Sequence, residues 1–292
     1  MNCPVCLSNG KPISKLKRNY SRCKSCKTLF SEAIASQEQL FAHYENYYTT
    51  SNLEVPNVAL LSLNETLENF SKYRTSNNII CDFGFGAGAL LQIAQASGWK
   101  CAGTEYSSDA VTKGKQCGWN VHLGDLNTND LPGPFDVLTI IETLEHVQEP
   151  QQMLAQAMQR LRSGGLIYGT TPNSQSVNAY LLREQWSVIT FPEHPILLSR
   201  KALISMLKEL GFVKISVRSK GLNPYDLISN ISSIFGRKDV SDNKVSGRVD
   251  YGYKLNTKFS KNALTRVIKS QINLVLGLLN RGDSLEFRAV KP

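Results

Sequence analysis

The residues most able to bind a ligand are an acid and three alternating glycines, Asp82, Gly84, Gly86 and Gly88. Glycine tolerates positive φ angles and lets a ligand come close to the backbone, so such a turn can cradle a cofactor. A β-branched apolar run precedes the turn and predicts a buried strand. The apolar segment after it predicts a helix, whose free N–H groups would face the turn.

Two classes of cofactor use a glycine turn of this kind. In dinucleotide-binding enzymes the pattern G-x-G-x-x-G/A places a pyrophosphate on the helix N-terminus, and Gly84, Gly86 and Ala89 match it loosely. Asp82 lies two residues before the first glycine, where its charge disfavours an anion and suits a cation. An oxidoreductase with a nicotinamide cofactor is therefore the weaker alternative.

Two more acids follow predicted strands. Glu105 ends a strand that begins at Lys100, and a carboxylate at this place can accept hydrogen bonds from both hydroxyls of a ribose. Asp125 follows the next strand, 120–123. Because the carboxyl ends of parallel strands meet at one edge of a sheet, the three acids indicate a single nucleoside site.

Strands and helices alternate from residue 79 onwards, which predicts a parallel sheet covered on both faces. Ser107 and Ser199 can cap two of the helices, and Pro150 can begin a third that Ser163, Gly164 and Gly165 would end. The predicted strands after the first three are 135–141, 166–170, 212–217 and the strictly alternating 284–290.

The glycine turn with Asp82 resembles the first motif of the class I S-adenosylmethionine-dependent methyltransferases, and segments 141–147 and 160–165 resemble later parts of the same family. The resemblance implies an α/β, Rossmann-like fold: a seven-stranded, mostly parallel sheet with an antiparallel last strand beside the sixth. It also implies that Asp125 takes the adenine amino group and that Leu126 packs on the ring. The implied cofactor-binding residues are Asp82, Gly84, Gly86, Gly88, Glu105, Asp125, Leu126 and Glu142.

Four cysteines near the N-terminus form two C-x-x-C pairs, Cys3 with Cys6 and Cys23 with Cys26. This spacing is typical of a zinc ribbon, in which four thiolates surround one tetrahedral ion. Since no ligand position is left for water, the predicted Zn²⁺ is structural. The remaining three cysteines are interpreted as small buried hydrophobic residues.

Two histidines are candidates for the base that would deprotonate an acceptor hydroxyl. His146 follows the fourth strand of the core, and His194 lies in the loop after the fifth, where the resembling family builds its acceptor pocket. The alternatives are that His146 only makes a hydrogen bond at a helix entry and that His194 only holds a proline-rich loop. Glu142 and Glu145 are lesser candidates.

The resemblance favours a hydroxyl of a sugar or nucleotide-linked sugar in surface-glycan biosynthesis as acceptor. RNA methylation is the second hypothesis, because zinc ribbons also precede some RNA-modifying relatives. Against it, Glu142-Thr143-Leu144-Glu145 stands where amino-methylating enzymes carry Asn/Asp-Pro-Pro-Tyr/Phe. The third hypothesis is a zinc-ribbon scaffold whose methyltransferase domain is inactive, and the intact acids argue against it.

The formal net charge of +9 is unevenly distributed. Residues 1–30 hold seven Lys/Arg and no acid, residues 31–213 hold eleven against eighteen acids, and residues 214–292 hold fifteen against six. The basic ends suit a polyanion or a phosphorylated acceptor. The alternative is that these lysines form an ordinary solvated surface, which is preferred over nucleic-acid binding because no nucleic-acid module is recognisable. No apolar run approaches a membrane span and no leader is visible, so we expect a cytoplasmic protein.

The expected division of the chain is a zinc ribbon (1–30), a helical linker or lid (31–75), the methyltransferase domain (76–221 and 284–292) and an insertion (222–283). In the linker, Phe41, Tyr44, Tyr47 and Tyr48 either cover the cofactor or pack between helices. In the insertion, an apolar helix is expected over 262–280. Its partner would be the domain or a second subunit of a homodimer, in preference to a membrane surface.

Overall fold

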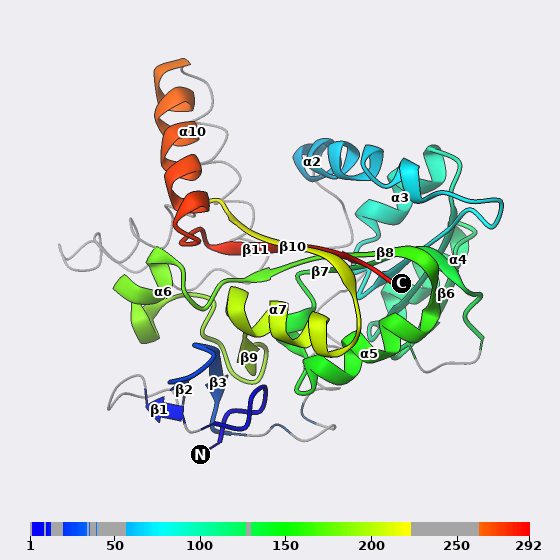
Figure 1. The fold of residues 1–292 in the computed structure, drawn as a ribbon. Coiled ribbons are helices and arrows are strands. Elements are labelled where there is room, and N and C mark those ends of the chain that lie inside the picture. The colour runs from blue at the N-terminus through cyan, green and yellow to red at the C-terminus, as the bar shows by residue number, and fades with distance from the viewer. Residues whose placement is uncertain are drawn as a thin grey trace.

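The computed structural model describes residues 2–8, 10–12, 20–33, 35, 39, 57–126, 130–222 and 263–292. A seven-stranded sheet lies at its centre, with helices on both faces (Figure 1). Across the sheet the order is β10 (Val213–Lys220), β11 (Ser284–Val290), β8 (Leu161–Pro172), β7 (Phe135–Ile141), β4 (Ile79–Phe83), β5 (Lys100–Glu105) and β6 (Asn120–Leu123).

The pairing directions confirm the predicted fold class. β4 is parallel to β5 and β7, β5 is parallel to β6, and β7 is parallel to β8. β11 is antiparallel to both of its neighbours, β8 and β10. The last strand thus inserts beside the sixth core strand, as expected, and the carboxyl ends of the parallel strands share one edge.

Helices cover the two faces through separate apolar clusters. On one face α3 (Ala89–Ala96) and α4 (Ser108–Gln116) bury Leu91 and Ala110 against the sheet, together with Leu67 of α2 (Asn57–Glu68). On the other face α5 (Pro150–Arg160) and α7 (Arg200–Glu209) bury Leu154 and Leu203. Both strand faces are therefore apolar, which explains the continuous hydrophobic runs of the sequence.

The predicted helix starts are observed. Ser107 Oγ accepts a hydrogen bond from Ala110 N (3.3 Å) and Ser199 Oγ accepts one from Ala202 N (3.1 Å), so both serines are N-caps. Pro150 is the first residue of α5. These local signals are strong enough to be recognised from the sequence.

One predicted helix end is wrong. α5 ends at Arg160, before the glycines expected to end it, because Leu161 is already extended and pairs with Phe135 of β7. β8 therefore begins five residues earlier than predicted. Gly164 has a φ of +73°, and a Cβ on Gly165 would lie 2.9 Å from a backbone oxygen, so the two glycines instead permit an irregularity within β8.

A second, four-stranded sheet contains the N-terminal segment. Its order is β1 (Gly10–Pro12), β2 (Tyr20–Cys23), β3 (Leu29–Ser31) and β9 (Ile196–Leu197). β9 belongs to the long segment after β8, so the methyltransferase part of the chain supplies one edge of the N-terminal sheet (Figure 1). The sequence analysis does not predict this strand.

The insertion is described only at its end. α10 (Ala263–Leu278) begins and ends within two residues of the expected helix and lies against β10 at its C-terminal end, where Ser219 Oγ donates to Leu276 O (3.3 Å). The predicted lid residues 41–48 and most of 222–262 lie outside the described residues. Among the described helices, none has the length and apolar character needed to cross a membrane.

Candidate active site

The glycine turn joins β4 to α3, where Gly84, Gly86 and Gly88 all have positive φ angles of 69°, 53° and 80°. A Cβ on Gly84 would lie 2.6 Å from the side chain of Thr143, and one on Gly88 would lie 2.4 Å from Trp119. Glycine is therefore required by both backbone conformation and space. The turn brings a bare backbone to the edge of the sheet, as a cofactor cradle needs.

Asp82 lies beneath this turn, only 4% exposed. Its Oδ1 accepts a hydrogen bond from Thr139 Oγ1 of the adjacent β7 (2.6 Å). Burial raises the pKa of Asp82 to about 7, against the opposing effect of that hydrogen bond. A buried carboxylate of this kind is stabilised by a cation placed beside it.

Glu105, at the end of β5, is tied directly to the turn. Its Oε2 accepts a hydrogen bond from Gly86 N (2.9 Å), and its Oε1 accepts bonds from Tyr106 N (2.6 Å) and Ser107 N (3.2 Å). Burial raises the pKa of Glu105, while the three backbone donors lower it. Two acids from neighbouring strands thus meet at one glycine turn.

Asp125 and Leu126 follow β6 and lie next to this pair. Gly124 N donates to Glu105 O (2.9 Å), which joins their loop to the end of β5. Leu126 is buried, and its carbonyl accepts a hydrogen bond from Arg160 Nε (3.1 Å). Asp125 is half-buried near Tyr106: burial raises the pKa of that tyrosine, and the carboxylate raises it further. The predicted adenine-recognition residues thus continue the same edge of the sheet.

Glu142 follows β7 with a φ of +47°, an uncommon conformation for a non-glycine residue. Its N–H donates to Thr170 O (2.9 Å) and its Oε1 accepts from Ser284 Oγ at 3.5 Å. These contacts lie toward β8 and β11, on the side of β7 away from Asp82 and Glu105. The assignment of Glu142 as a cofactor-binding residue stays a prediction.

The two predicted histidines lie together. The ring of His146 also contacts the backbone of Glu193, 47 residues later in the chain. His146 Nδ1 lies 3.0 Å from Glu193 O, and His194 Nδ1 lies 2.7 Å from Val188 O and 3.1 Å from Thr190 Oγ1. The two rings are 4.6 Å apart, edge to face. Because a carbonyl oxygen can only accept, each neutral ring must carry its proton on Nδ1, which leaves the Nε2 lone pair as the basic site.

Glu145 lies beside this pair and is 1% exposed. Its Oε2 accepts a hydrogen bond from Thr171 Oγ1 (2.9 Å), and burial, followed by the charge of Glu142, raises its pKa well above the usual value. One ligand atom each from Glu145, His146 and His194 lie within 4.8 Å of one another, so these groups could also hold a divalent cation.

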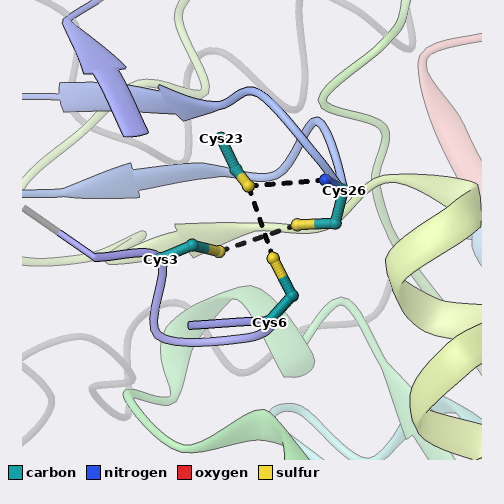
Figure 2. A group of neighbouring side chains, drawn as sticks. All are labelled: Cys3, Cys6, Cys23 and Cys26. Atoms are coloured by element: carbon teal, nitrogen blue, oxygen red, sulfur yellow. Dashed lines mark hydrogen bonds between the residues drawn. The ribbon is translucent and has the colours of Figure 1, made fainter. Parts of the chain in front are cut away.

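The four N-terminal cysteines come together with their sulfur atoms pointing toward one another (Figure 2). Cys3 Sγ is 3.6 Å from Cys26 Sγ, Cys6 Sγ is 3.4 Å from Cys23 Sγ, and all seven cysteines of the chain are free thiols. A tetrahedral Zn²⁺ with Zn–S bonds of about 2.3 Å requires sulfur separations of about 3.8 Å. The hydrogen bond between Cys3 and Cys26 lowers the pKa of Cys26 and raises that of Cys3, so the first thiolate of this pair forms on Cys26. The donor set fits Zn²⁺.

Two further residues, not recognised from the sequence, hold Asp82 and the His194 loop in place. Thr139 holds Asp82, and its signal was a polar residue within the otherwise apolar run 137–141. Tyr20 donates its hydroxyl hydrogen to His194 O (2.7 Å) and Thr190 O (3.1 Å). No local pattern could connect Tyr20 with a loop that lies 170 residues later in the chain.

A protein-family model described as a methyltransferase domain matches residues 59–217. The chain belongs to this methyltransferase family. Together with the fold, this membership confirms that the chain contains the predicted methyltransferase domain. The match ends within β10, so it includes the glycine turn and both histidines but not the cysteine cluster.

Curated relatives match a shorter part of the family's domain. The ubiquinone biosynthesis O-methyltransferase of Methylococcus capsulatus is 33% identical over 35% of this chain and 46% of its own length. The protein of the same name from Colwellia psychrerythraea is 29% identical over 35% and 45%. The chain thus matches about half the length of these relatives.

A solved structure supports the fold at greater coverage. A SAM-dependent methyltransferase from Archaeoglobus fulgidus superposes with a TM-score of 0.51 and 18% identity, over 80% of this chain and 94% of that one. At this identity the likeness shows the shared fold. The acceptor must be argued from the site.

Proposed function

We propose that this methyltransferase moves the methyl group of S-adenosylmethionine to a hydroxyl of a small molecule. The observation that carries the proposal is the meeting of Asp82 and Glu105 at a glycine turn, together with a pair of histidines whose Nδ1 atoms face backbone carbonyls. The curated relatives are named as O-methyltransferases, which supports a hydroxyl acceptor.

Each cofactor residue would contact a different part of the cofactor. Asp82 would stabilise the positively charged end of the cofactor, and Glu105 would accept hydrogen bonds from the ribose hydroxyls. Asp125 would accept one from the adenine amino group, and Leu126 would pack on the ring. Gly84, Gly86 and Gly88 let the cofactor approach the backbone. A buried acid with a pKa near neutrality suits this role, because the arrival of a cation favours its ionised form.

Methyl transfer to a hydroxyl needs one base and accurate alignment of the acceptor oxygen with the methyl carbon. S-adenosylmethionine supplies a methyl group on a positively charged sulfur, so the electrophile is already activated. His194, or His146 beside it, would remove the hydroxyl proton at Nε2, which would leave the oxygen ready to accept the methyl group that S-adenosylmethionine would release from its sulfur. The carbonyls of Glu193 and Val188 orient the rings.

The chain divides, in this proposal, into the four parts expected from the sequence, with a structural zinc ribbon at 1–30. Four clustered thiols that can bind Zn²⁺ fit a reducing compartment, which supports a cytoplasmic location. The preferred acceptor is a hydroxyl of a sugar or nucleotide-linked sugar, since the basic ends of the chain suit its phosphates. An RNA acceptor is the alternative.

A methyl-labelled assay read by mass spectrometry tests the acceptor. Nucleotide sugars, quinone precursors and RNA would be incubated separately with labelled S-adenosylmethionine. Labelled methyl on a sugar oxygen supports the preferred acceptor, and label on a quinone-precursor oxygen keeps the hydroxyl chemistry but replaces the sugar. Label on a base nitrogen or carbon of RNA would overturn the proposal.

Glu105→Ala tests the cofactor assignment. The variant loses the carboxylate that binds both the ribose and Gly86, so the cofactor dissociation constant should rise about 10- to 100-fold, with a smaller effect on the acceptor. Glu209→Ala, an exposed acid on α7, is the matched control for calorimetry. An unchanged dissociation constant would remove Glu105 from the site.

A further inference from the structure

The second cysteine pair is bound to the methyltransferase domain through its backbone. Three successive carbonyls of this turn accept hydrogen bonds from that domain: Ser25 O from Lys201 Nζ (3.2 Å), Cys26 O from Ser199 Oγ, and Lys27 O from Ser174 Oγ (3.0 Å). Ser199 is also the N-cap of α7. The turn that holds two metal ligands is therefore joined to both ends of the segment 174–201.

The same segment completes the ribbon sheet. β9 pairs with β3 in the register Leu29↔Leu197 and Phe30↔Ile196, and Ser31 N donates to Pro195 O (2.8 Å). An apolar cluster lies below this pairing and combines ribbon and loop residues: Tyr20, Leu29, Ala179, Trp186, Ile189 and Leu197. The loop that carries His194 thus has the ribbon as its packing partner.

Tyr20 links the ribbon directly to the candidate base. It is 3% exposed, and its hydroxyl lies 2.7 Å from His194 O and 3.1 Å from Thr190 O. Thr190 Oγ1 in turn lies 3.1 Å from His194 Nδ1. One buried hydroxyl therefore fixes the backbone on both sides of the turn that orients the imidazole.

We propose that the metal-bound ribbon positions His194, with Tyr20 as the positioning residue, so that metal loading controls the acceptor side of the site and leaves the cofactor side unchanged. The relevance of this control to catalysis rests on the proposed role of His194. Described ribbon strands have only three or four residues each, too few to form a stable sheet alone. In such small folds the metal supplies the folding free energy, and the loop depends on the sheet it joins.

Hydrogen exchange with zinc analysis tests the coupling. Cys6→Ser removes one exposed ligand without touching the loop and, unlike a chelator, leaves the Glu145–His146–His194 cluster intact. We expect lost zinc and amide exchange at least about tenfold faster across residues 186–198. Calorimetry should show S-adenosylmethionine affinity within about twofold of the wild type. Loop exchange that stays unchanged after zinc loss would overturn the proposal.

Tyr20→Phe tests the positioning residue with all four cysteines in place. Loss of its hydroxyl should accelerate exchange around residues 188–195 by about 3- to 10-fold at full zinc content and lower kcat with little change in KM for the cofactor. Tyr168→Phe is the matched control, because it removes a buried hydroxyl that donates to Glu286 Oε2 (3.0 Å) on β11. Equal effects of the two variants on the loop would refute the assignment.

These readouts separate the two proposals. Neither hydrogen exchange nor cofactor affinity depends on the acceptor, so a wrong acceptor would leave the test of coupling valid. If Cys6→Ser unfolds the whole chain, Tyr20→Phe decides alone. Faster loop exchange with unchanged kcat would keep the positioning of the loop but remove His194 as the base, which overturns the catalytic part of the inference.

Discussion

The cofactor side and the acceptor side of this site are built in different ways. On the cofactor side, Gly86 and Glu105 are hydrogen-bonded across only 19 residues, and each functional group lies at the end of a regular strand. On the acceptor side, Tyr20 reaches His194 across 174 residues. The proposed cofactor side is therefore local in the sequence, whereas the proposed acceptor side depends on a separate small sheet.

The largest expected effect comes from the acceptor side. His194→Asn keeps a donor that can reach Val188 O but removes the basic nitrogen, so turnover should fall about 100- to 10,000-fold, the usual contribution of a general base. Cofactor affinity by calorimetry should not change. His122→Asn, on β6, is the control. Turnover within threefold of the wild type, on the order of experimental scatter, would leave His146 as the candidate.

Asp82→Asn should move affinity and stability in opposite directions. Asn can still accept from Thr139, but it carries no charge to stabilise a cation, so the dissociation constant of S-adenosylmethionine should rise about 10- to 100-fold at pH 8. The free protein should instead become more stable. The rise of the Asp82 pKa to about 7 costs the fold on the order of 1–4 kcal/mol above that pH.

The contribution of Asp82 to the free energy of unfolding should change over a defined range of pH. The folded protein binds the proton of Asp82 more tightly than the unfolded chain, so this group's contribution to stability is lost as pH rises from about 4 through about 7. The difference between the melting temperatures at pH 5 and pH 8 should therefore be smaller in Asp82→Asn than in the wild type. A variant that is less stable than the wild type at pH 8 would contradict the buried-charge interpretation.

Gly84→Ala should have an intermediate effect and can be compared with Gly221→Ala. Both glycines have φ near +70°, but a Cβ at residue 84 would clash with Thr143 while one at 221 would meet nothing within 4 Å. We expect about 1–2 kcal/mol of destabilisation at 221 and a further 1–3 kcal/mol, roughly, at 84. Only Gly84→Ala should weaken cofactor binding. Equal losses in urea unfolding would show that the close approach is unimportant.

The contrast also explains what the sequence could predict. Asp82, the glycines and Glu105 were recognisable because strand ends and tight turns carry short-range signals, and the cap residues Ser107 and Ser199 fixed the helix starts. The early start of β8 was missed because a pairing with Phe135 overrides the local preference of a glycine pair to end a helix. Tertiary contacts of this kind are invisible in a single sequence.

The acceptor side was only partly predictable for the same reason. His146 and His194 were identified from their places after strands, but the sequence did not indicate that their rings would meet, or that β9 would join the ribbon. The cysteine spacing predicted the ribbon and placed it in a separate domain. In the structure the ribbon packs against the loop that carries His194, because long-range strand pairing and a shared apolar cluster connect the ribbon with this loop.

The smallest expected effect is at the far end of the cofactor side. Asp125 is half-buried, so water can partly replace the contact that we propose between it and the adenine amino group. Asp125→Asn keeps a carbonyl acceptor and should raise the cofactor dissociation constant about threefold or less, whereas Asp125→Ala removes the acceptor and should raise it about 3- to 10-fold. Fluorescence or calorimetric titration with S-adenosylmethionine, and with an analogue that lacks the amino group, distinguishes these cases. If Asp125 reads the adenine amino group, the analogue should bind Asp125→Ala and the wild type with nearly equal affinity, and an undiminished difference would place Asp125 outside the adenine contact.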